Sequence, residues 1–200
     1  MKKVFILLSA AFIIFCACST RTNVKRVDAD TQIDLSGYWN DTDVRIVCEA
    51  LINDCLRNPR VDQAVRAMGR TPMVIVGRFR NESSEHINTA IISSTMESAI
   101  FNSGRLDFVA GGDLRDEIRI ERADQQNNAS PETMARLRNE TGADYMMTGT
   151  VRSIVDRDGN QSVRTYFVTA ELTDIETNQR IWMGQNSEIK KLVTQPRNRP

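Results

Sequence analysis

Two sets of residues in this sequence have the types and spacing for enzymatic chemistry, and each lacks a required part. Ser187 and Lys190 match the Ser-x-x-Lys spacing of penicillin-binding enzymes, in which the serine is the nucleophile. That serine must begin a helix beside a cleft, whereas Ser187 lies at the end of a predicted strand and no Lys-Thr-Gly or Ser-Asp-Asn motif accompanies it. His86 is the single histidine, and its polar surroundings between a strand and a helix are ordinary loop material. We therefore predict no catalytic residues and a protein that is not an enzyme.

The sequence also lacks the residue sets that metal, redox or cofactor sites require. Cys48 and Cys55 are seven residues apart on one face of a predicted helix, so their Cα atoms lie about 10 Å apart and cannot be bridged. With one histidine in the chain they also make a poor zinc set. The stretch at 111–113 follows a predicted strand but lacks the Gly-x-Gly-x-x-Gly spacing of a phosphate loop. We predict buried structural thiols, no metal and no cofactor.

The cysteine nearest the N-terminus has a different context. Two lysines precede an apolar run over residues 4–17, which is 14 residues long, whereas a membrane-spanning helix needs about 20. The run ends at the small Ala17 before Cys18, which resembles a bacterial lipobox. We expect residues 1–17 to be a lipoprotein signal peptide and Cys18 to be lipidated, with an ordinary cleaved signal as the alternative. By resemblance to lipoprotein sorting rules, Ser19 points to the outer membrane.

The rest of the chain divides by composition. Residues 18–32 contain the lipidated cysteine and a polar, flexible tether, of which residues 20–32 reach about 45 Å at most. Residues 33–193 have the length and apolar content of one globular domain, and residues 194–200 form a disordered tail. Without the signal, 24 basic and 26 acidic residues remain, a net charge of −2. This balance predicts no nucleic-acid partner and contacts made through shape and local charge.

Hydrophobic periodicity predicts a mixed α/β domain. The strand over 73–79 is continuously apolar, which is typical of a central strand buried on both faces. The last third of the chain has the two-residue period of strands, with a tight turn at Asp158 and Gly159. The strand over 163–173 is expected to have one buried face and one largely solvent-exposed face. We predict a mixed sheet that has a C-terminal antiparallel three-stranded meander and is flanked by helices. The expected helices are 41–57, 61–68, 87–103, 113–125 and 131–141, and the expected strands are 73–79, 106–110, 145–155, 163–173 and 180–189.

With these residues laid out, the sequence resembles the LpoB-type activators of penicillin-binding proteins. Stretches that carry the resemblance occur in the family's order from residue 34 to residue 191, which is 158 of 200 residues. They are DLSGYWNDTD at 34–43, VIVG at 74–77 with Asn81 and 85–87, FNSG at 101–104, Arg119 with 121–122 and 125–126, GADYMMTG at 142–149, DIET at 174–177, and Ile181 with Trp182.

This resemblance implies a fold similar to the N-terminal domain of TolB and related to the lipoprotein CsgG. It implies a non-catalytic lipoprotein, anchored to the periplasmic face of the outer membrane, that binds and activates a bifunctional peptidoglycan synthase, a class A penicillin-binding protein. The family's known members have a long proline-rich tether, whereas this tether is short. Reaching an inner-membrane synthase would then require that the synthase extends outward or that the lipoprotein stays in the inner membrane.

Polar residues around the first predicted strand and on the predicted helix at 113–125 are the candidates for partner contact. We expect them to lie on the surface, so that reversing their charge weakens binding and leaves the melting temperature nearly unchanged. They are Asn81, Glu82, Glu85, His86, Arg119 and Arg122. The alternative function is a structural or secretion-associated subunit of an outer-membrane assembly, as the relationship to CsgG would allow.

Overall fold

The computed structural model describes residues 23–28, 31–136 and 139–195. The expected signal peptide, Cys18 and residues 196–200 lie outside this described part. Residues up to Thr31 form one unit and the chain from Gln32 onward forms another. No described helix is both long enough and apolar enough to cross a membrane.

Asparagine side chains set the starts of the first helices. The Asn40 side chain accepts a hydrogen bond from the Asp43 N–H, and the Asp43 carboxylate accepts one from the Asn40 N–H, so the two residues form a capping box. Asn58 ends this helix and caps the next, while Gly104, at φ 64°, ends the third in the left-handed conformation. The helices are α2 (Asp41–Arg57), α3 (Pro59–Met68), α4 (Thr89–Ser103) and α5 (Gly112–Asn128).

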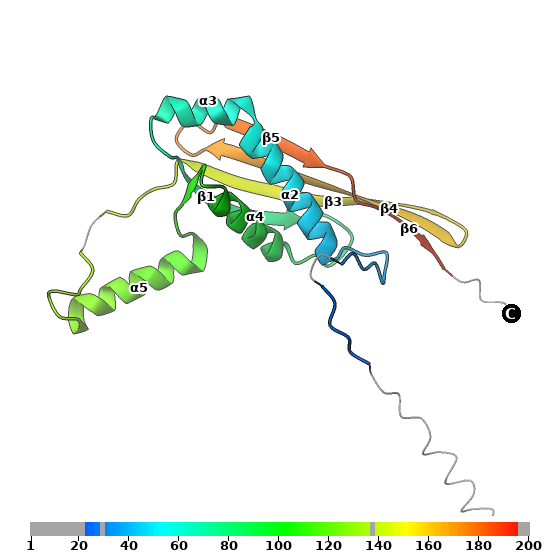
Figure 1. The fold of residues 1–200 in the computed structure, drawn as a ribbon, viewed down its shortest axis with the longest axis horizontal. Coiled ribbons are helices and arrows are strands. Elements are labelled where there is room, and N and C mark those ends of the chain that lie inside the picture. The colour runs from blue at the N-terminus through cyan, green and yellow to red at the C-terminus, as the bar shows by residue number, and fades with distance from the viewer. Residues whose placement is uncertain (1–22, 29–30, 137–138, 196–200) are drawn as a thin grey trace, which may run out of the picture. The chain divides into compact units, whose positions relative to one another are not determined.

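Six strands form one mixed sheet, ordered β2-β1-β3-β4-β5, with β6 also paired to β4. β1 is parallel to β2 and β3, whereas β3, β4 and β5 form an antiparallel meander. The long hairpin of β3 and β4 ends at the turn at Gly159 (Figure 1). The predicted mixed α/β fold with its C-terminal meander is confirmed. The strands are β1 (Met73–Asn81), β2 (Asp107–Phe108), β3 (Tyr145–Asp158), β4 (Gln161–Asp174), β5 (Arg180–Asn186) and β6 (Lys190–Thr194).

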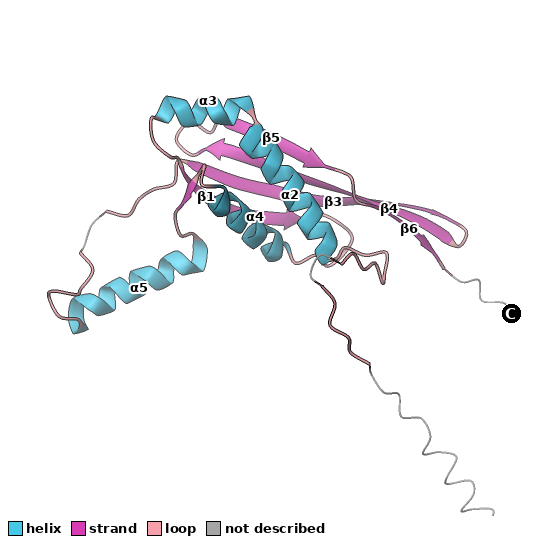
Figure 2. Ribbon diagram, viewed as in Figure 1, coloured by secondary structure: helices cyan, strands magenta, loops and turns pink. Residues whose placement is uncertain are grey.

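The helices α2, α3 and α4 cover one face of the sheet. α2 and α4 cross in front of the strands in Figure 2, and they pack against β5 and β1 respectively. Their buried side chains, such as Val47, Ile92 and Met96, belong to the same core cluster as Val168 and Leu172 of β4. Alternate residues of β4 are buried and the intervening ones are partly exposed, as its period predicts. The opposite face of the sheet is covered by no helix in the described part of the chain.

Three details of the predicted elements are wrong. β1 is not buried on both faces, because the helices pack on one face only and Arg78 and Arg80 are exposed on the other. The predicted helix at 131–141 is a single turn at Ser130 in the described residues, because a short segment with little to bury does not hold a helix. The last predicted strand is divided at Asn186, whose side chain accepts a hydrogen bond from the Glu188 N–H, and β6 then pairs with β4.

Cys48 and Cys55 are buried and free, as predicted. Burial raises the pKa of each thiol to about 12, and thiolates are the reactive form. In a Cys16→Ser, Cys18→Ser variant, we expect both thiols to resist an aromatic disulfide reagent at pH 8 and to react fully in urea. Rapid labelling of the folded protein would contradict this burial.

Candidate functional site

The loop between β1 and α4 is organised by Asn81. Its side-chain amide donates a hydrogen bond to the Glu85 carbonyl at 2.7 Å, and its carbonyl oxygen accepts bonds from the Ser83 N–H and hydroxyl. These bonds close the loop on itself and leave His86 exposed. The loop therefore presents a fixed polar surface in which Asn81 has mainly a structural role.

Glu85 is not a surface residue, so its expected position is wrong. Its side chain is 7% exposed. One carboxylate oxygen accepts hydrogen bonds from Arg164 at 2.7 Å and from the Tyr166 hydroxyl at 2.8 Å, and the other accepts from the Tyr166 hydroxyl and from the Trp39 N–H. Burial raises the pKa of Tyr166, and the hydrogen bond to Glu85 raises it further. Glu85 thus connects the loop to β4 and to the segment before α2.

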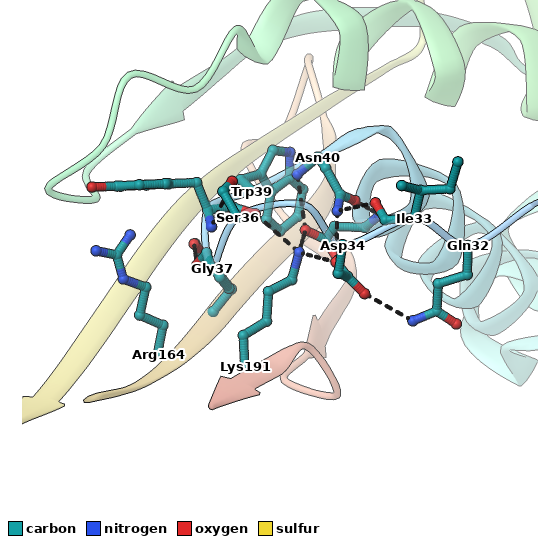
Figure 3. A network of polar contacts seen from close by, with 12 residues as sticks. Gln32, Ile33, Asp34, Ser36, Gly37, Trp39, Asn40, Arg164 and Lys191 are labelled. Atoms are coloured by element: carbon teal, nitrogen blue, oxygen red, sulfur yellow. Dashed lines mark hydrogen bonds and ion pairs between the residues drawn. The ribbon is translucent and has the colours of Figure 1, made fainter. Parts of the chain in front are cut away.

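A second buried ion pair lies next to this one. Figure 3 shows Lys191 of β6 reaching Asp34 and the backbone before α2. The Lys191 ammonium lies 2.6 Å from an Asp43 carboxylate oxygen and 2.8 Å from an Asp34 carboxylate oxygen, and it donates to the Tyr38 carbonyl. Burial raises the pKa of Asp43, whereas the bond to Lys191 lowers the pKa of Asp34. The segment 34–43 is therefore held to the last strand by one cation.

Arg119 and Arg122 are both paired with Glu140. Arg119 makes two parallel bonds to the Glu140 carboxylate, at 2.9 and 3.0 Å, and Arg122 lies 3.5 Å from it. The bonds from Arg119 lower the pKa of Glu140. α5 has no buried residue, as its mixed charge predicts. These two arginines belong to a different surface from that of residues 81–86.

Glu82 lies at the rim of a hollow on the uncovered face of the sheet. Its carboxylate lies 2.7 Å from the Arg152 guanidinium and 3.8 Å from that of Arg80. The hollow spans β1, β3, β4 and β5 and has a volume of about 730 Å³. We call it the sheet groove. It is lined by four arginines, one glutamate, two methionines and small or hydroxyl residues: Arg78, Arg80, Arg152, Arg180, Glu171, Met146, Met183, Gly77, Thr148, Gly149, Thr150, Thr169 and Ala170.

The sheet groove is positively charged and partly apolar. Four guanidinium groups face two carboxylates, that of Glu171 in the groove and that of Glu82 at its rim, in a chain whose acidic and basic residues are equal in number. Met183 is 60% exposed and Met146 is 37% exposed, and flexible thioether side chains adapt to varied partners. Such a surface suits a protein contact.

Sequence reasoning missed the sheet groove, although its signal was present. Side chains two residues apart on a strand share a face, so Met146, Thr148, Thr150 and Arg152 had to lie opposite the buried side chains of β3. Among the described residues no cluster of histidine, cysteine or acidic side chains is suited to a metal ion. The chemistry that the groove itself offers is charge pairing through its guanidinium groups.

Asp144 fastens the start of β3 and gives stability a pH dependence. Its carboxylate accepts two bonds from Arg70, at 2.6 and 2.8 Å, and one from the Met73 N–H. The bond from Arg70 lowers the pKa of Asp144, so the stabilisation is complete above the unfolded pKa of about 3.9 and is lost as pH falls through the folded value. We expect the urea midpoint of the wild type to fall more steeply below about pH 4 than that of Asp144→Asn. Parallel profiles would contradict this role.

Comparison with known proteins identifies the family. The family model described as "Peptidoglycan-synthase activator LpoB" matches residues 43–187. The chain belongs to the LpoB family. The family is one of activators, so this LpoB-family protein is a regulator of peptidoglycan synthesis and not an enzyme. A search of curated proteins found no match.

Solved structures with a similar fold include members of the LpoB family. The C-terminal domain of LpoB from Escherichia coli is 18% identical, with 76% of this chain and 99% of that one covered and a TM-score of 0.44. The same domain from Salmonella enterica has the same identity and coverage, with a TM-score of 0.39. Lipoprotein GNA1162 from Neisseria meningitidis is 16% identical over 64% of this chain and 88% of that one, with a TM-score of 0.39. The family assignment of this LpoB-family protein rests on the family model.

Proposed function

We propose that this protein is a lipid-anchored periplasmic regulator that binds and activates a bifunctional peptidoglycan synthase, a class A penicillin-binding protein. The observation that carries the proposal is the match of residues 43–187 to the family of synthase activators. The lipobox-like residues before Cys18 support a lipid anchor on the periplasmic face of the outer membrane. An acyl anchor of more than one chain holds a protein stably at a membrane.

The sheet groove and its rim are the surface that best supports contact with the synthase. The groove combines charge, exposed methionines and an uncovered sheet face. Glu82 pairs with Arg152 at its rim, and Asn81 and His86 are exposed residues of the same loop. Glu85 supports this rim from beneath. Arg119 and Arg122 of α5 are proposed as a separate contact, with Glu140 as their resting partner.

Activation requires that the protein binds the active conformation of the synthase more tightly than the inactive one, because equal affinity for both shifts nothing. We expect the mature lipoprotein in detergent to raise the rate of glycan polymerisation by the synthase of the same organism, and to do so saturably. The matched control is a synthase reaction with detergent alone. An unchanged rate at concentrations where binding is saturated would show that the protein does not activate this enzyme.

The lipid anchor is tested separately. A Cys18→Ala variant should no longer incorporate radiolabelled palmitate and should leave the outer-membrane fraction, while the wild type stays there. The alternative function, a structural subunit of an outer-membrane assembly, predicts a large ring on sizing in detergent. A small particle that still stimulates the synthase would exclude that alternative.

A further inference from the structure

Three of the four arginines of the sheet groove are already paired with carboxylates of the same chain. Arg180 lies 2.7 Å from Glu171, and Arg152 lies 2.7 Å from Glu82. Both glutamates are about a third exposed or more, at 34% and 40%. Exposed pairs of this kind contribute little to stability and exchange readily. The groove therefore holds carboxylate positions that another acidic group can take.

The fourth arginine of the groove, Arg78, follows a glycine, so the groove floor beside it carries no side chain. Arg78 makes no ion pair with any described residue, and Gly77 precedes it. A Cβ atom at Gly77 would lie 3.0 Å from the Thr148 methyl group and 3.5 Å from the Met146 sulfur. The missing side chain leaves both of these groups accessible from the groove. An incoming segment thus meets an unpaired cation next to an apolar floor.

We propose that the sheet groove binds an acidic segment of the partner protein, whose carboxylates replace Glu171 and Glu82 as partners of Arg180 and Arg152. Glu171 and Glu82 act as internal competitors that keep the arginines paired until the partner arrives. The identity of the partner rests on the proposed function, whereas the acidic chemistry rests on the groove itself.

The composition of the groove favours an acidic protein segment over an anionic glycan. Guanidinium groups match the planar fork of a carboxylate and pair with it in two parallel bonds. Met146 and Met183 add adaptable apolar contact, which suits acidic side chains that alternate with apolar ones. No aromatic ring is among the residues that line the groove.

Charge variants with opposite expected effects test the exchange. We expect Arg78→Glu combined with Arg152→Glu to weaken binding of the soluble periplasmic region of the synthase by about tenfold or more, mostly at low salt. Glu171→Gln should instead tighten it by a few-fold, because a competitor is removed. Arg45→Glu is the control, since Arg45 is an exposed arginine on α2, which packs on the other face of the sheet. Arg78→Gln is a milder variant should the double reversal disturb folding.

The outcomes separate this inference from the proposed function. Weaker binding by the arginine variants together with tighter binding by Glu171→Gln supports the exchange. Unchanged binding in every groove variant, or weaker binding by Glu171→Gln, overturns it even when the wild type activates the synthase. Should the wild type not bind the synthase, poly-L-glutamate serves as the probe: binding that the arginine variants lose supports an acidic ligand, and no binding overturns it. Loss of co-sedimentation with purified sacculi in the arginine variants, with synthase binding intact, makes the ligand a glycan and overturns the inference.

Discussion

Glu85→Ala is expected to lower the free energy of unfolding by about 3–4 kcal/mol, because it removes one partner of a buried ion pair. The substitution leaves the Arg164 guanidinium without its carboxylate, and that side chain is 11% exposed. It also removes both carboxylate acceptors of the Tyr166 hydroxyl and leaves only the Gly37 carbonyl, at 3.4 Å. An uncompensated buried cation and a hydroxyl that retains only a long hydrogen bond both destabilise the folded state.

Urea denaturation of the purified protein measures this effect. The control is His86→Ala, one residue further along the same loop and exposed, which should change the unfolding free energy by less than about 0.5 kcal/mol. Equal, small changes in the two variants would show that Glu85 is not held as the structure describes. If Glu85→Ala loses this stability, a binding defect of the same variant reflects the altered fold and not the loss of a direct contact with the partner.

Lys191→Met is expected to destabilise the protein by about 3 kcal/mol, because it leaves the buried Asp43 carboxylate without its cation. The Asp43 side chain is 5% exposed, and burial already raises its pKa. Without Lys191 that pKa rises further, so the loss of stability should be larger at pH 8 than at pH 5, as the carboxyl must ionise inside the protein.

Lys190→Met is the matched control, since it removes the same charge from the neighbouring, exposed position of β6. Denaturation at both pH values should show a pH-dependent loss for Lys191→Met and almost none for the control. Adding Asp43→Asn to Lys191→Met should restore part of the stability. A loss that is independent of pH, or that Asp43→Asn worsens, would argue against the buried pair.

Much of this fold was predictable because local signals agreed with the tertiary packing. Asn40 before the apolar stripe of α2 marked the helix start, and Gly104 marked the end of α4. The alternating pattern of β4 identified its buried face. The segment after Ser130 had a cap and a proline, yet it forms one turn in the described residues because a short helix depends on packing that this segment lacks.

The candidate site was less predictable, because its contacts join distant parts of the sequence. Glu85 looks like ordinary loop material, and its partner Arg164 comes 79 residues later. The Asp34 and Lys191 pair is separated by 157 residues. The sheet groove combines arginines from β1, β3 and β5, and only the pairing of these strands brings them to one face. The local pattern predicted the exposed face of β4 but not that of β1, and it did not predict which charges share the groove.

The contact between segment 34–37 and β6 also makes this domain a candidate for circular permutation. Gly37 packs so closely on Val193 that a Cβ atom there would overlap its side chain, and Asp34 is bound to Lys191. The two ends of the folded unit therefore lie side by side, so a short glycine-rich linker can join them. New ends at the Gly159 turn would place the proposed lipid anchor at the far tip of the β3–β4 hairpin while the sheet groove stays intact. Such a permutant would reveal whether the position of the proposed anchor on this domain matters to activation of the proposed synthase partner.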